Sequence, residues 1–131
     1  MCLDVDDAAA IAGLARALAW TCAREEVDGV PLVERRREAL EAAMWRAARH
    51  GLDGLLVDPR GRGELPAADA LDLLLTHVRE GLDAHGDREA VEELVGALVA
   101  RGNGAARQRR ARQELASGAA LVAELVAATV P

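Results

Sequence analysis

Apolar residues at helical spacing run through nearly all of this 131-residue chain. They recur every three or four positions in five or six segments, and Gly or Pro residues separate most of these segments. The apolar content is mostly Ala, Leu and Val, with no Phe or Tyr, and Ala and Leu are the strongest helix formers. The sequence therefore predicts a mainly all-α fold of five to six helices, in a single helical domain over residues 1–131.

The first two predicted helices cover residues 6–26 and 31–50. We expect Asp6 or Asp7 to be the N-cap of the first helix. Pro31 is expected at the first position of the second helix, and Gly51 at its C-terminal cap. The apolar stripe expected to face the core in the first helix is Ile11, Leu14, Ala15, Leu18 and Cys22. The corresponding residues of the second helix are Leu32, Leu40, Ala43 and Ala47.

One stretch has strand character. Leu55, Leu56 and Val57 are apolar and lie between glycines and a proline, which predicts a short extended arm or hairpin near 54–65. Helices are expected again over residues 66–85 and 87–101, then from the N-cap Asn103, and last around residues 118–130. Their expected apolar stripes are Leu71, Leu74, Leu75, Val78 and Leu82, then Val91, Leu94, Val95, Leu98 and Val99, and finally Leu121, Val122, Leu125 and Val126.

Charge and cysteine content exclude several classes of protein. The net charge of −6 argues against a nucleic-acid partner, because such domains are usually basic. Cys2 and Cys22 fit neither a disulfide framework nor a metal site. The Ala-rich run 8–23 is shorter than the ~20 apolar residues of a membrane span. No signal peptide is recognisable, so we expect a cytoplasmic protein with no membrane partner.

Two groups of arginines are the candidates for a binding site. Arg46 and Arg49 are three positions apart, so they share a helix face beside Trp45. They could hold a carboxylate or phosphate, or form only a solvated helix face. The second group, Arg107, Arg109, Arg110 and Arg112, lies near the start of a helix, where positive charge is unfavourable. Pairing with acids such as Glu114 is one explanation of that group, and an anion site or an acidic partner surface is the other.

Two segments that contain these arginines resemble one known family. Residues 45–66 read WRAARHGLDGLLVDPRGRGELP, and residues 102–126 read GNGAARQRRARQELASGAALVAELV. Together with CLDVDDAAAIAGLARAL at residues 2–18, they resemble the C-terminal region of the bacterial carboxylate–amine ligases, the family-two glutamate–cysteine ligases. The match follows the family order along nearly the whole chain. By this resemblance, the chain corresponds to the helical C-terminal part of a larger α+β ligase fold.

The resemblance implies an ATP-dependent ligase of glutathione or other thiol biosynthesis. Such enzymes phosphorylate the side-chain carboxylate of glutamate, and a small amine such as that of cysteine then displaces the phosphate. ATP and Mg²⁺ are the implied cofactors. The implied substrate- or phosphate-binding residues are Arg46, Arg49, Arg107 and Arg109, with Trp45, His50 and Gln108 in support. No catalytic residue or metal ligand is assigned to this chain.

Two departures from the family pattern indicate that the chain is incomplete for catalysis. Ala42 and Ala43 stand where the family usually has a Glu-Asn pair. The family's metal-binding glutamates and nucleotide contacts lie on an antiparallel sheet that would precede residue 1. The alternative is a non-catalytic helical interaction module that binds a partner chain or a small anion. Because the helix at 6–26 is apolar nearly all round, we expect a homodimer or a sheet-bearing partner chain.

Overall fold

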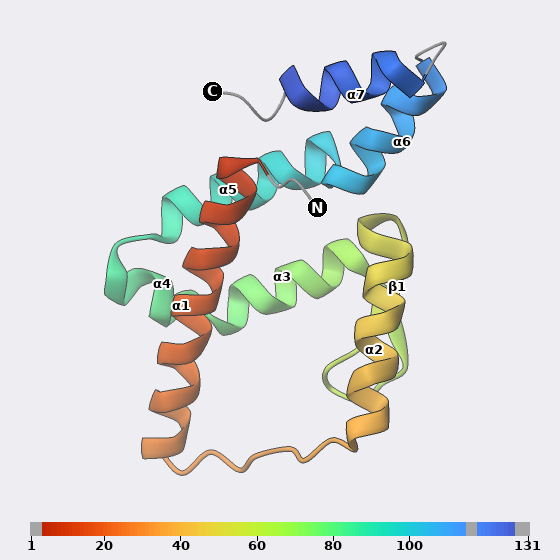
Figure 1. The fold of residues 1–131 in the computed structure, drawn as a ribbon. Coiled ribbons are helices and arrows are strands. Elements are labelled where there is room, and N and C mark those ends of the chain that lie inside the picture. The colour runs from red at the N-terminus through yellow and green to blue at the C-terminus, as the bar shows by residue number, and fades with distance from the viewer. Residues whose placement is uncertain (1–3, 115–117, 128–131) are drawn as a thin grey trace.

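The computed structural model describes residues 4–114 and 118–127 and is mainly helical, as predicted (Figure 1). The helices in these ranges are α1 (Val5–Val27), α2 (Arg37–His50), α3 (Ala67–His77), α4 (Arg79–His85), α5 (Arg88–Arg101), α6 (Gly104–Glu114) and α7 (Gly118–Ala127). A 3-10 turn, η1 (Gly51–Asp53), follows α2. Strands β1 (Leu55–Val57) and β2 (Glu64–Pro66) pair antiparallel with Leu56 opposite Leu65, which confirms the predicted hairpin.

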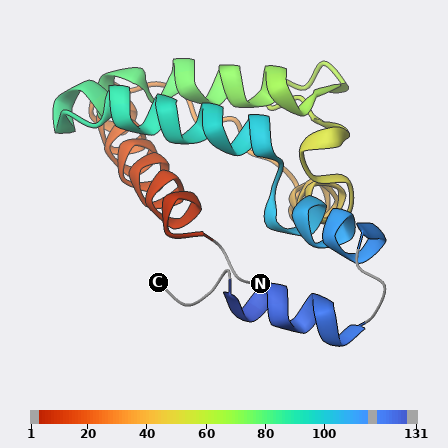
Figure 2. The same ribbon diagram turned by 90° about the horizontal axis from the view of Figure 1, so that it is seen from above.

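Helices α1 and α2 extend from the two ends of a layer that contains α3 and α5 (Figure 1). α3 and α5 run side by side, and α1 packs across α4 and α5 at one end of this layer (Figures 1 and 2). At the other end, α2 and the hairpin adjoin the start of α3 (Figure 1). Residues 28–36 connect α1 to α2 without helix or strand. α7 contacts α6 and lies apart from the main layer (Figure 2).

The core lies where α1 meets α4 and α5. Its buried apolar residues are Ala10, Ala17, Val78, Leu82, Val91 and Val95, with Leu14, Leu71, Leu74, Leu75 and Leu94 packed against them. The stripe predicted within residues 66–85 is therefore confirmed. The single helix predicted there is divided at Val78, where φ is −91° and ψ is 5°. The apolar pattern did not reveal this break because both helices face the same core.

The buried face of α1 differs from the stripe expected from the sequence. Its buried residues are Asp7, Ala10, Gly13, Ala17 and Thr21. Of the expected stripe, Leu14 packs on the core, whereas Ile11, Ala15, Leu18 and Cys22 are exposed. Apolar residues occupy nearly every side of α1, so periodicity alone did not identify the buried one. The neighbouring helices instead pack against the side with the smallest residues.

Two glycines let the helix backbones approach closely. A Cβ on Gly81 of α4 would lie 2.6 Å from the carbonyl oxygen of Ala17, a backbone atom of α1. A Cβ on Gly13 of α1 would lie 2.5 Å from Cγ2 of Val91 on α5. Thr21 is buried as well, and its hydroxyl donates to the Ala17 carbonyl at 2.9 Å. Small side chains therefore set the spacing of these three helices.

The second helix is shorter and more exposed than predicted. It begins at Arg37, so Pro31 lies in the connection and is not its first residue. No residue of α2 is buried, and the expected core residues Leu32, Leu40 and Ala47 are exposed, with Ala43 half-buried. In α5, Val91 and Val95 are buried as expected, but Val99 is 44 % exposed. Of the stripe expected in the last helix, Val122 and Val126 are exposed, whereas the side chains of Leu121 and Leu125 lie outside the described part of the structure.

Gly81→Ala is expected to destabilise the protein by about 1–3 kcal/mol, because the new methyl group meets backbone that cannot rotate away. Gly96→Ala on α5 is the matched control, since a Cβ there has nothing within 4 Å. That control is expected to gain about 0.4–1 kcal/mol. Urea unfolding of both variants measures the difference, and equal stability of the two would contradict the close approach of α1 and α4.

Candidate functional site

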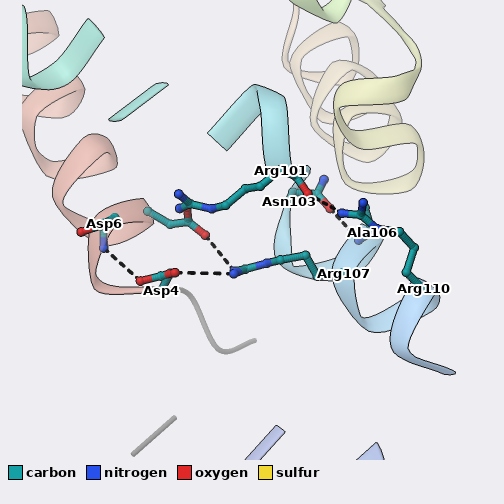
Figure 3. Close-up of polar contacts among 8 residues, drawn as sticks. Asp4, Asp6, Arg101, Asn103, Ala106, Arg107 and Arg110 are labelled. Atoms are coloured by element: carbon teal, nitrogen blue, oxygen red, sulfur yellow. Dashed lines mark hydrogen bonds and ion pairs between the residues drawn. The ribbon is translucent and has the colours of Figure 1, made fainter. Parts of the chain in front are cut away.

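A fully buried carboxylate joins the start of α1 to α5 and α6. Asp7 is 1 % exposed, and its Oδ1 pairs with Nη2 of Arg101, the last residue of α5. Its Oδ2 lies 3.4 Å from Nη2 of Arg107 on α6. Arg107 also reaches Asp4 at 3.5 Å (Figure 3). The N-cap of α1 is Asp4, whose side chain accepts from the Asp6 N–H at 3.4 Å, so the cap expected at Asp6 or Asp7 is wrong.

The two arginine-containing segments meet at the start of α6. Asn103 caps this helix, as predicted, with Oδ1 accepting from the Ala106 N–H at 2.9 Å. The Asn103 amide also packs on Gly51, where a Cβ would lie 2.7 Å from Nδ2. Gly51 has a φ of 60°, which only glycine adopts readily, and it ends α2 as predicted. The turn after α2 therefore lies against the turn before α6.

A basic hollow of about 400 Å³ opens at this junction. It is lined by Asp53 of η1, by Arg101 and Gly102 at the end of α5, and by Arg109, Arg110 and Gln113 of α6. Gly102 has a φ of 80°, and Arg110 donates from Nη2 to the Arg101 carbonyl oxygen (Figure 3). A larger hollow of about 560 Å³ lies over acidic residues of α4 and α5, away from both arginine-containing segments.

The arginines of α2 are each held by a neighbour. Arg46 is half-buried and forms an ion pair with Glu64 of β2. Arg49 lies with its guanidinium carbon 5.9 Å from the centre of the Trp45 ring, a cation–π contact. Trp45 is itself 64 % exposed, and His50 is exposed at the end of α2. These residues share one end of the molecule with the basic hollow, but none of them lines it.

The two arginines of α6 that the sequence assigns to anion binding, Arg107 and Arg109, differ in their surroundings. Arg107 is engaged by Asp4 and Asp7, and Gln108 is half-buried. Arg109 is exposed and lines the hollow, and its side chain forms no ion pair or hydrogen bond with another described residue. Of the four arginines expected to bind an anion, Arg109 is therefore the one placed in a hollow and left available.

The model of Glutamate-cysteine ligase family 2 (GCS2) matches residues 1–127 of the chain. The chain belongs to this family. Three similar proteins carry names beginning "Putative glutamate–cysteine ligase 2". The one from Frankia alni is 51 % identical over 85 % of this chain and 29 % of that protein. The one from Rhodopirellula baltica is 39 % identical over 97 % of this chain and 33 % of that protein. The one from Streptomyces coelicolor is 42 % identical over 99 % of this chain and 35 % of that protein.

These shares mean that the chain spans about a third of the length of the curated relatives it matches. It is thus a fragment-sized member of glutamate–cysteine ligase family 2, as the resemblance indicated. No solved structure is significantly similar to the chain.

The implied Mg²⁺ has no evident ligands in the described part of this family member. Within residues 4–114 and 118–127, no group of three or more His, Cys, Asp or Glu side chains is arranged to hold a metal ion. Three acids beside the arginines are engaged in ion pairs with them: Asp4 with Arg107, Asp7 with Arg101, and Glu64 with Arg46. No helix in the described ranges has the length and hydropathy needed to cross a membrane.

The hairpin tip is an ordered part of the same family segment. Asp58 is 5 % exposed and accepts from the Arg60 side chain at 2.9 and 3.0 Å and from the Arg60 backbone N–H at 2.8 Å. The Arg60 guanidinium holds the pKa of Asp58 below its ordinary value of 3.8. Arg35 donates to the Pro59 carbonyl oxygen at 2.8 Å, which ties the connection before α2 to the hairpin.

Sequence reasoning missed three residues of this region. Asp7 was read only as a helix cap, whereas it is the buried partner of two arginines. Arg101 lies just before the second segment, residues 102–126, and belongs to no motif that the sequence analysis recognised. Asp53 lies within the first segment, and its place opposite the α6 arginines follows only from the contact between Gly51 and Asn103.

Asp7→Asn is expected to destabilise the protein by roughly 1.5–3 kcal/mol, because it leaves two arginines without their shared carboxylate. Asp6→Asn is the control, since Asp6 is exposed on the same turn, and its cost is expected to stay within about 0.5 kcal/mol. Urea unfolding midpoints compare the two. An Asp7→Asn variant as stable as the control would contradict the role of Asp7 in joining α1 to α6.

Proposed function

We propose that this chain is the helical C-terminal part of an ATP-dependent carboxylate–amine ligase that forms a γ-glutamyl amide through an acyl phosphate. The observation that carries this proposal is the meeting of two segments. Residues 45–54 and 102–109 hold the family pattern, lie about fifty positions apart, and come together at the Gly51–Asn103 contact beside the basic hollow. Membership of glutamate–cysteine ligase family 2 supplies the reaction class.

In this proposal the chain supplies guanidinium groups, not the metal or the nucleotide site. Glutamate, its acyl phosphate and ATP all carry negative charge, and arginines are well suited to bind carboxylates and phosphates. Arg109 in the hollow remains open to such a ligand. The described residues do not fit Mg²⁺, so the rest of the ligase would have to hold the metal ion.

An exposed apolar surface supports the view that the chain is one part of a larger enzyme. This α2 surface consists of Leu40 and Met44, which lie one turn apart on α2 and are 52 % and 73 % exposed. In the connection before α2, Leu32 and Val33 are 92 % and 71 % exposed. Large apolar patches on soluble proteins usually mark a site that another chain or segment covers. Since the relatives are about three times as long, we assign the α2 surface to the remaining part of the ligase.

The alternative function is a non-catalytic interaction module. The observation that favours it is the absence, in the described ranges, of any acidic group able to hold a metal ion. Ala42 and Ala43, in place of the polar pair usual in the family, point the same way. In that case a second copy of the chain would cover the flank of α1 formed by Ile11 and Leu18, which are 52 % and 38 % exposed.

Phosphate release separates the two functions. With ATP, Mg²⁺, glutamate and cysteine, the chain alone is expected to be inactive. Mixing it with the remaining two thirds of the Streptomyces coelicolor relative, expressed as a separate polypeptide, is expected to give turnover. Met44→Glu should abolish this turnover because it places a charge in the docking surface, whereas Val122→Glu on α7 should not.

Turnover by the chain alone would contradict the view that it is incomplete. No turnover in the mixture, with no association of the two polypeptides in sedimentation, would contradict the ligase proposal.

A further inference from the structure

Four exposed residues form one stripe along α2. They follow each other at spacings of four, three and four positions, which places them on the same side of the helix. This stripe, which we call the Trp45 face, consists of Glu38, Ala42, Trp45 and Arg49. α2 lies at one edge of the molecule, and Trp45 is 64 % exposed there (Figure 1). The Trp45 face is therefore open to another molecule.

The charges at the two ends of the Trp45 face have no oppositely charged partner among the described residues. The Glu38 side chain forms no ion pair or hydrogen bond there, and the Arg49 guanidinium carbon lies 5.9 Å from the centre of the Trp45 ring. The helix dipole favours an acid near the start of a helix and a base near its end, which explains the two charges by themselves. It does not explain an exposed Trp between them, and Trp and Arg are enriched where proteins bind each other.

The Trp45 face is complementary to itself when two copies of α2 run antiparallel. In that arrangement Glu38 of one copy lies opposite Arg49 of the second copy. Trp45 then lies opposite Ala42, whose small side chain leaves room for the indole ring. A two-fold axis repeats both contacts, as an isologous interface requires. A parallel pair would instead place Glu38 against Glu38 and Arg49 against Arg49, which is repulsive.

We propose that the Trp45 face is a self-association site, at which α2 packs antiparallel against α2 of a second copy of this chain. The two Trp45 rings and the two Ala42 side chains form the centre of the contact, and two ion pairs between Glu38 and Arg49 border it. The Trp45 face differs from the α2 surface assigned to the rest of the ligase. Met44 precedes Trp45 by one position, so their side chains point about 100° apart around the helix. The inference therefore does not rest on the proposed function.

A contact along a single helix face is small. Specific interfaces usually bury at least about 1,200 Å² in total, and smaller ones are transient. We therefore expect a dissociation constant on the order of 0.1–1 mM, so that the chain is monomeric when dilute. Exposed ion pairs contribute little individually, but the two-fold axis makes each substitution act twice.

Concentration dependence of the full chain tests this inference directly. Sedimentation equilibrium measures the dissociation constant, and NMR locates the contact. The shift of the Trp45 indole N–H is expected to change with protein concentration, whereas that of Trp20 on α1 is the internal reference and should stay constant. Trp45→Ala is expected to weaken association at least about tenfold. Met44→Glu, on the neighbouring side of α2, should leave the constant within about threefold.

Charge reversal tests the antiparallel pairing. Glu38→Arg and Arg49→Glu are each expected to weaken association at least about tenfold, because each places two pairs of like charges in contact. The double variant Glu38→Arg/Arg49→Glu restores opposite charges, so its constant is expected to return to within about threefold of the original. Glu93→Arg is the matched control, since it makes the same charge change at an exposed position of α5 and should leave association unchanged.

A double variant that associates no better than the single variants, or association that Trp45→Ala does not weaken, would overturn the inference. Association that Ile11→Glu weakens in place of Trp45→Ala would overturn it as well, since the contact would then lie on the flank of α1. A Trp45 shift that stays constant up to about 1 mM protein would exclude self-association at this face. If that shift then changed on adding the remaining two thirds of the Streptomyces coelicolor relative, the Trp45 face would belong to the ligase interface instead.

Discussion

The structure depends on a buried carboxylate with two arginine partners. Asp7 leaves water almost completely, which is unfavourable for a charge unless it is paired. Arg101 and Arg107 supply that pairing, and they come from the two ends of the turn between α5 and α6. The start of α1 thereby fixes where α6 begins, and the position of α6 in turn sets the basic hollow against η1. A charge that sequence analysis treated as a helix cap therefore organises the candidate site.

Much of the fold could be predicted from periodicity and turn residues, because each helix carries its own apolar stripe and stop signal. The hairpin, the Asn103 cap and the core residues Val78, Leu82, Val91 and Val95 were all accessible in this way. The buried side of α1 could not be predicted in this way. Gly13 and Gly81 set the distance between the helices here, and a glycine at a close contact does not stand out in a pattern of apolar residues. The exposure of α2 was also missed. An amphipathic pattern indicates that a helix has an apolar face, but not whether that face packs against the same chain.

The sequence indicated which segments contain the candidate site, but not how their side chains are arranged in space. The motifs indicated Arg46, Arg49, Arg107 and Arg109 as a group, whereas the structure gives three of them partners within the chain. Arg109 differs because its helix turns it toward a hollow that Asp53 completes. Such a pairing joins residues more than fifty positions apart, so it follows from the Gly51–Asn103 contact and not from spacing along the sequence.

The central claim is that α2 belongs to an interface with the rest of a ligase. Amide hydrogen exchange of α2 (Arg37–His50) tests it most directly, with α5 (Arg88–Arg101) as the internal reference. In the isolated chain α2 should exchange much faster than α5, because none of its residues is buried. Adding the remaining two thirds of the Streptomyces coelicolor relative should slow exchange in α2 and leave the centre of α5 unchanged. Exchange in α2 that is as slow as in α5 in the isolated chain, and unaffected by the added polypeptide, would contradict the account.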